Sequence, residues 1–129
     1  MLIQEKSHLG YELVRSLKKN FFHMGLIDHG LPNPVRMKRG TILVLALNLA
    51  KELKEQIPDK RVGVVLPSGT GGLLANLGLI LADKIPVNLN FTIGEESLRY
   101  SMKKAEVSTI ISAAAVRENI TDFPWPQNI

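Results

Sequence analysis

The fold is decided by residues 61–90, which read RVGVVLPSGTGGLLANLGLILADKIPVNLN. The stretch opens with a β-branched run, residues 61–66, that ends at Pro67 and predicts a buried strand. Residues 73–82 are apolar on all sides, which predicts a buried helix. Apolar residues then alternate with proline and asparagine over residues 85–90, which is the period of a second strand. Together the three segments predict a strand–helix–strand unit.

Toward the C-terminus the pattern continues with another helix and a third strand. Residues 92–95 read TIGE, a capping-box pattern that predicts the start of a helix. The buried stripe of this helix is expected at Leu98, Met102 and Ala105. Residues 107–111 form a further β-rich run. This alternation of strands and helices predicts a parallel sheet with right-handed crossovers.

Two more helices are expected before this unit. Helical spacing of apolar residues predicts the first over residues 9–17, with Ser7 as its N-cap. The second is expected over residues 40–57, where a proline follows. Its apolar residues cover two faces in its first half, which predicts burial between layers. Short extended pieces are expected near residues 26–27 and 35–37.

The fold class is therefore α/β: a layered parallel sheet of βαβαβ type with covering helices. The sequence has no internal repeat. Residues 1–122 are assigned to one α/β segment and residues 123–129 to a connector, because Phe-Pro-Trp-Pro cannot form regular structure. Trp125 is interpreted as a packing anchor. A domain rarely stops just after such a linker, so the sequence is expected to be cut from a longer protein.

The residue types exclude several kinds of chemistry. The chain has no cysteine, which rules out disulfides, thiolate metal sites and cysteine nucleophiles. Its histidines, His8, His23 and His29, do not have the spacing of metal ligands. Asp28 adjoins His29, but neighbours along a strand face opposite sides, so this pair is not expected to act together. We therefore expect no metal site and no histidine-based catalysis.

The charge pattern does not favour nucleic acid as a partner. The formal net charge is +4, but the basic residues are scattered and aromatic residues make up only 5% of the chain. Nucleic-acid binding requires a basic patch combined with stacking aromatics. We therefore interpret the basic residues as solvated surface.

One segment has the length of a membrane span. Residues 62–82 carry no charge, and 21 residues are enough to cross a bilayer. The glycine-rich run inside this segment would break a helix and leave backbone groups unpaired in lipid. The start of the chain does not have the pattern of a signal peptide. A cytoplasmic location is therefore expected.

The turn after the first predicted strand carries the only motif that suggests a ligand. Ser68, Gly69 and Thr70 follow a strand and precede a helix, where free N–H groups and the helix dipole favour a phosphate. The Walker A lysine is absent, so the favoured interpretation is a glycine turn that lets strand and helix pack closely. A phosphate-binding turn is the alternative. Asn88 and Asn90 are interpreted as turn and capping residues.

The order of these motifs resembles that of the adenylate-forming enzymes, which include acyl-CoA synthetases, luciferase and peptide-synthetase adenylation domains. Residues 61–67 are similar to the family's V-G-(V/I)-x-L-P strand, and residues 85–90 to its V-P-L-N-P segment. Residues 47–53 are similar to the L-A-x-x-L helix, and residues 95–112 to the helix and strand that follow. The resemblance extends over about residues 7–126.

Two details refine the resemblance. Residues 86–92, PVNLNFT, look most like the branch of acyl-[acyl carrier protein] synthetases and 2-acylglycerophosphoethanolamine acyltransferases. Asp83 stands where that branch usually has glycine. Aspartate tolerates the left-handed conformation that often ends a helix, so the departure is expected to be harmless.

The resemblance implies a function for a longer parent enzyme. That enzyme would activate a fatty acid with ATP and Mg²⁺ to an acyl-adenylate and transfer the acyl group to a thiol of a carrier protein or coenzyme A. The family's phosphate loop, S-G-T-T-G-x-P-K, is absent here, and no catalytic residue can be assigned to any position. The chain is expected to be a structural segment that is inactive alone, and its own cofactor is expected to be none.

Two partner sets follow from the two interpretations. A segment of a larger enzyme would pair with the remainder of that enzyme, and alone would self-associate through uncovered apolar surface. The alternative is a stand-alone, non-enzymatic α/β module that binds a phosphate ligand or a protein at residues 68–72. The first predicts no response to nucleotides, and the second predicts stabilisation by them.

Overall fold

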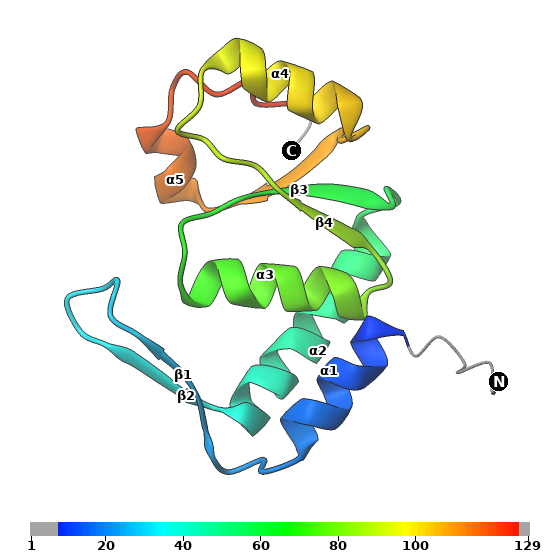
Figure 1. Cartoon of the computed structure of the whole chain (residues 1–129), viewed down its shortest axis with the longest axis vertical. Helices are drawn as coiled ribbons and strands as arrows, with labels where there is room; N and C mark the ends of the chain where they lie inside the picture. Colours follow the sequence, from blue (N-terminus) through cyan, green and yellow to red (C-terminus); the bar gives the residue numbers. More distant parts are fainter. Residues whose placement is uncertain (1–7, 127–129) are drawn as a thin grey trace, which may run out of the picture.

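The computed structural model describes residues 8–126 (Figure 1). From residue 61 to residue 112, helices and strands alternate in the order that the sequence predicts, and a short helix that was not predicted follows. The elements are α1 Leu9–Lys18, β1 Met24–Asp28, β2 Val35–Lys38, α2 Arg39–Gln56, β3 Arg61–Val65, α3 Thr70–Leu81, β4 Ile85–Asn88, α4 Glu95–Lys104, β5 Thr109–Ser112 and α5 Ala114–Asn119.

The predicted parallel sheet is confirmed. It has three strands in the order β4-β3-β5, and β3 pairs in parallel with both neighbours. Val62 lies opposite Pro86 on one side and Thr109 on the other. Strands β1 and β2 form a separate antiparallel hairpin, which confirms the extended pieces expected around the first loop.

The elements stack in layers around this sheet (Figure 1). Helix α3 covers one face, with α2 and α1 beyond it, and α4 and α5 lie on the other face. Strand β3 is buried on both faces, as its continuous apolar run predicts. A Cβ atom on Gly63 would lie 3.0 Å from Val107 and 3.1 Å from Leu89, so side chains pack tightly against the centre of β3.

The buried side chains form three clusters that follow the layers. Between the sheet and the α3–α2 layer they are Ala50, Leu53, Val62, Val64, Ala75, Leu79 and Ala82. On the opposite face they are Val65, Leu89, Leu98 and Phe123. Between α2, α3 and α1 they are Ile42, Ala46 and Leu77. Burial of each large apolar side chain stabilises the fold by about 1.5–3 kcal/mol.

Helix α2 begins at Arg39, one residue before the predicted start, and ends at Gln56. The predicted burial of its first half on two faces is wrong, because Leu45 and Leu47 are 39% and 46% exposed. The N-cap of α1 is His8, whose Nδ1 accepts a hydrogen bond from the Gly10 amide at 3.0 Å. The predicted cap, Ser7, lies outside the described residues.

The predicted capping box at residues 92–95 is wrong. Helix α4 begins at Glu95 with Gly94 as N-cap, and no side chain caps it. The Thr92 amide and hydroxyl instead donate to Asn90 Oδ1, at 3.0 and 2.7 Å. The short asparagine side chain competes for the threonine, which therefore belongs to a turn rather than to the helix.

The segment at residues 123–126 has no helix or strand, and it packs against the sheet. Phe123 is buried, and its ring centroid lies 4.4 Å from that of Trp125. Trp125 Nε1 donates to the Ile120 carbonyl at 2.9 Å, which confirms that the tryptophan is a packing anchor. Within residues 8–126, no helix has both the length and the apolar character that crossing a membrane requires.

Candidate functional site

The glycine-rich turn, for which phosphate binding was the alternative interpretation, lies between β3 and α3, at the carboxyl end of the central strand. In open α/β sheets this is the end where ligands bind. Gly69 has φ +148°, a conformation that side-chain-bearing residues rarely adopt. Helix α3 begins at Thr70, three residues before the predicted start, so the backbone N–H of Thr70 lies at the helix N-terminus.

A carboxylate from the hairpin occupies this N-terminus. Asp28 is the last residue of β1, and its Oδ2 accepts hydrogen bonds from the Thr70 amide and the Thr70 hydroxyl, both at 2.7 Å. Its Oδ1 accepts from the Gly30 amide at 2.9 Å. The Thr70 hydroxyl, then the Thr70 amide and then the Gly30 amide lower the pKa of Asp28 below its usual 3.8. The ionised carboxylate also complements the helix dipole.

Of the three candidate phosphate-binding residues, Ser68, Gly69 and Thr70, only Thr70 donates hydrogen bonds to an anion, the carboxylate of Asp28. Thr70 donates both of its groups, Gly69 provides the room, and Ser68 is exposed. A cavity of about 260 Å³ adjoins the turn, with Asp28 in its lining. An external phosphate would have to displace this carboxylate, so phosphate binding stays a prediction. Asp28 was missed because its contact spans 42 positions of the chain.

The interpretation as a turn residue is confirmed for Asn90 and is wrong for Asn88. Asn90 holds the turn before α4. Asn88 forms a reciprocal amide pair with Asn76 of α3, with N···O distances of 3.0 and 2.8 Å. The pair ties the end of β4 to α3 and leaves both amides engaged.

Asp83 adopts the left-handed conformation expected of it, with φ +59°. Its carboxylate contacts Lys60 Nζ at 2.9 Å and His8 Nε2 at 3.0 Å. The hydrogen bond from Lys60, then that from His8, lowers the pKa of Asp83. This exposed cluster ties α1 to the end of α3. Among the described residues, no group of three or more histidine, aspartate or glutamate side chains could hold a metal ion.

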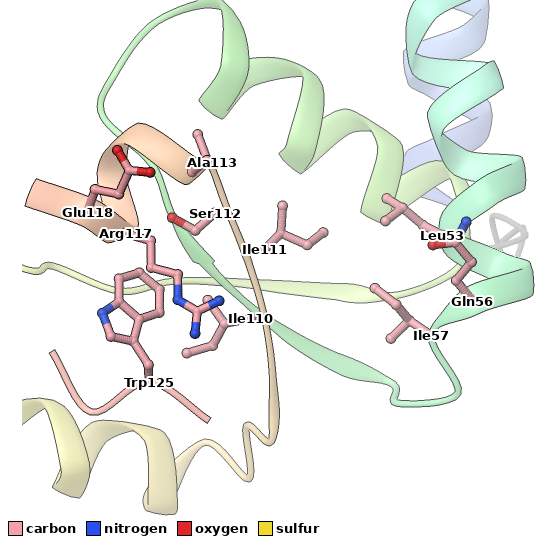
Figure 2. A pocket seen from close by; sticks show the side chains of 11 residues that line it. Leu53, Gln56, Ile57, Ile110, Ile111, Ser112, Ala113, Arg117, Glu118 and Trp125 are labelled. Carbon is pink, nitrogen blue, oxygen red and sulfur yellow. The ribbon is translucent and has the colours of Figure 1, made fainter. Parts of the chain in front are cut away.

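A larger cavity, of about 720 Å³, lies beside β5 (Figure 2). Its walls are mainly apolar and come from the end of α2, from β5 and from Trp125. Arg117 and Glu118 of α5 supply its charged groups. Ser112 also lines it, but its hydroxyl donates to the Val65 carbonyl at 2.8 Å. No sequence pattern indicates this cavity, because each lining residue has an ordinary structural role in its own element.

Comparisons with known proteins bear on the fold. No model of a known protein family matches the chain. Among solved structures, it superposes on the N-terminal subdomain of Klebsiella oxytoca NpsA in complex with anthranilyl-AMSN, with a TM-score of 0.74 and 14% identity over 92% of this chain and 29% of that one. The inhibitor-bound N-terminal domain of FACL13 from Mycobacterium tuberculosis gives a TM-score of 0.74 and 17% identity over 92% of this chain and 31% of that one.

A benzoate CoA ligase from Burkholderia xenovorans LB400 gives a TM-score of 0.71 and 20% identity over 88% of this chain and 23% of that one. The chain therefore spans less than a third of the length of each of these structures. At these identities the likeness concerns the fold. It confirms the predicted α/β architecture, which these N-terminal subdomains share.

Proposed function

We propose that the chain is the N-terminal structural segment of an AMP-forming fatty-acid ligase and is inactive alone. The observation that carries the proposal is the shared architecture, which covers 88% of this chain and 23% of a benzoate CoA ligase, and 92% of this chain in an N-terminal subdomain. The order of motifs at residues 61–67 and 85–90 supports the same assignment. The acyl-[acyl carrier protein] synthetase and 2-acylglycerophosphoethanolamine acyltransferase branch is the finer part of the proposal.

The described residues do not fit ATP and Mg²⁺. The anion-binding groups of Thr70 are engaged by Asp28. No lysine follows the turn, and residues 8–126 offer no cluster of three metal-binding side chains. In this proposal, ATP, Mg²⁺, the fatty acid and the acceptor thiol, on a carrier protein or coenzyme A, are bound by the remainder of the parent enzyme, in the cytoplasm. We assign no catalytic step to this chain.

The role of this chain is then structural. Strand β3 is buried on both faces and fixes the positions of α3 and α4, which cover the sheet. A rigid layer of this kind can hold loops from other segments within the small tolerances that catalysis requires. The remainder of the parent enzyme is accordingly the main partner.

The test is an ATP–pyrophosphate exchange assay with the purified 129-residue chain and a series of fatty acids. We expect no exchange above the protein-free blank. The matched control is a longer product of the same gene that extends past the codon for Ile129. An in-frame S-G-T-T-G-x-P-K motif and exchange activity in that product would support the proposal. Exchange by the short chain alone would overturn it.

The second candidate is the non-enzymatic module that binds a phosphate ligand. One observation favours it: the Thr70 amide and hydroxyl already hold an oxyanion, which is that of Asp28. Replacement Asp28→Asn removes the competing charge, so a module of this kind should then bind inorganic phosphate or AMP more tightly. Thermal shift with ATP, AMP and acyl-CoA on both proteins separates the candidates, because a structural segment should show no shift with either.

A further inference from the structure

The net charge of the protein is concentrated in α1 and the β1–β2 hairpin. Residues 8–39 carry six basic and two acidic side chains, whereas residues 40–126 carry nine of each. The formal net charge of +4 therefore comes entirely from the first of these two parts. Helix α1 and the hairpin lie at one end of the molecule, and α4 and α5 lie at the other (Figure 1). One end is thus positively charged, and the rest is neutral.

Four basic side chains gather around the loop that joins α1 to β1. Lys18 is the last residue of α1, and Lys19 is its C-cap. The Arg39 guanidinium donates to the Lys19 carbonyl at 3.5 Å, and Lys38 lies opposite Met24 in the register of the hairpin. None of the four forms an ion pair with another described residue, so their charges are not neutralised within this part of the chain.

The same loop presents an aromatic side chain at its tip. The His23 amide donates to the Asn20 carbonyl at 2.8 Å, which closes a turn with Phe21 and Phe22 at its two central positions. Phe22 is 76% exposed, and Met24, which follows the turn, is exposed as well. Large apolar side chains therefore stand between the basic groups, on the surface of the molecule.

This loop has a fixed conformation. The Gly40 amide donates to the Phe21 carbonyl, and the Arg39 amide donates to the His23 carbonyl, both at 2.9 Å. The ring of Phe21 occupies the place where a side chain on Gly40 would lie, and its centroid is 5.2 Å from that of Phe22. A loop that is already ordered loses little conformational freedom when it binds a partner.

The composition of the loop indicates the kind of partner. Protein–protein interfaces are depleted in lysine, and the burial of an unpaired charge is costly. Surfaces that lie on an anionic bilayer have the opposite composition, with lysine and arginine around apolar side chains that enter the headgroup layer. Nucleic acids require aromatic side chains on which successive bases stack, and here Met24 stands beside the exposed ring of Phe22.

We infer that the loop between α1 and β1 is a site of peripheral contact with an anionic lipid bilayer. Phe22 and Met24 enter the headgroup layer, and the ammonium groups of Lys18, Lys19 and Lys38 contact the lipid phosphates. The inference goes beyond the proposed function. It is compatible with that function, because the loop lies at the opposite end of the molecule from α4, α5 and the β5 cavity (Figure 1). The sheet edges and the cavity are left to the remainder of the parent enzyme.

Co-sedimentation of the 129-residue chain with vesicles tests the inference. We expect binding to vesicles of equal parts phosphatidylcholine and phosphatidylglycerol, a decline as salt is added, and no binding to phosphatidylcholine alone. Lys18→Gln with Lys19→Gln should weaken binding about 25-fold, since each basic residue near the surface contributes about fivefold. The matched control is Lys103→Gln with Lys104→Gln at the end of α4, which makes the same change in net charge and should leave binding unchanged.

The apolar part of the contact is tested separately. Phe22→Ser should weaken binding to the anionic vesicles at least about tenfold, because the ring no longer enters the bilayer. Tyr100→Ser is the matched control, since Tyr100 is also an exposed aromatic residue but lies on α4. Both side chains are exposed, so neither substitution should change the thermal midpoint, which separates a loss of binding from a loss of the fold.

A nitroxide label reports whether the loop enters the bilayer, since the sequence has no cysteine of its own. For a label at Phe22→Cys, binding to anionic vesicles should increase relaxation by dissolved oxygen and decrease relaxation by a water-soluble nickel chelate. A label at Tyr100→Cys should show neither change.

Four results would contradict the inference. The first is a chain that does not sediment with anionic vesicles. The second is an equal loss of binding from the two lysine pairs, which would show a general effect of charge. The third is a single-stranded oligonucleotide that competes with the vesicles, which would identify a nucleic-acid surface. The fourth is a longer product of the same gene whose vesicle binding is insensitive to Phe22→Ser, which would show that the remainder of the parent enzyme covers the loop.

Discussion

The turn after β3 and the outer edge of β5 differ in how well their sequence motifs indicate which groups are free to bind. The turn has glycines, a helix N-terminus and a threonine hydroxyl, but Asp28 of the same chain engages those donors. The β5 edge has no motif, but no strand among residues 8–126 pairs with its outer side, and a mainly apolar cavity lies beside it. A sequence motif therefore indicates which groups can bind a ligand, while the tertiary contacts decide whether those groups are available.

The largest loss of stability is expected from a substitution within the turn that Asp28 holds. Substitution Gly69→Ala forces a Cβ atom to within 2.7 Å of Asp28 Oδ2 and strains a residue with φ +148°. We expect a loss of about 2–3 kcal/mol, because the strain and the displaced carboxylate add. The urea midpoint measures it.

Gly71→Ala is the matched control, because no atom lies within 4 Å of the Cβ that it would add. Alanine is the better helix former, so this substitution should raise stability by about 0.5 kcal/mol. Equal losses from both substitutions would show that the turn is not held by Asp28.

Removal of the Asp28 carboxylate is expected to destabilise the turn less than Gly69→Ala does. Asp28→Ala deletes the acceptor of the Thr70 amide and hydroxyl and opens the turn to solvent. Hydrogen exchange at the Thr70 amide should become several-fold faster, and exchange at Val64 in the centre of β3 should not change. An unchanged Thr70 amide would mean that the helix N-terminus is protected by something other than this contact.

Acidification should break the same contact reversibly. The folded protein lowers the pKa of Asp28 below its usual 3.8, so the contribution of its charge to stability is fully present above that value. The contribution is lost as pH falls through the lower, folded pKa. The difference in unfolding free energy between the native chain and Asp28→Asn should therefore be constant at neutral pH and should decline only below pH 3.8. A difference that already declines at pH 6 would contradict this assignment.

The smallest effect is expected at the open edge. Arg117 is exposed and makes no ion pair among residues 8–126. Arg117→Ala should change the stability of the dilute monomer by less than about 0.5 kcal/mol, the usual range for surface positions. A larger loss would show that the guanidinium supports the fold. Arg117 would then have a partner within the chain, as the donors of Thr70 do.

The parallel sheet and helices α3 and α4 could be predicted because their signals are local. Residues 61–90 carry the periods of a strand, a buried helix and a second strand within one short stretch. The left-handed Asp83 and the packed Trp125 were also predictable, since each follows from residue chemistry and nearby prolines or helix ends.

The wrong predictions and the omissions have a common physical cause. In each case, residues outside the motif make contacts that the motif alone does not reveal. The capping box failed because Asn90 engages Thr92 first. The state of the phosphate turn depends on Asp28, which reaches it from a hairpin 42 positions away. The β5 cavity collects residues from α2, β5, α5 and Trp125, and its position depends on which strand lies at the edge of the sheet.

Trp125 is the only tryptophan in the chain, and it stands at the rim of the β5 cavity. Its indole N–H is fixed to the Ile120 carbonyl, so the ring has one orientation. The protein consequently contains an intrinsic optical probe at the edge of its sheet. Whatever covers that edge will change the polarity around the ring and shift its emission, and association can therefore be followed by fluorescence in the unlabelled chain.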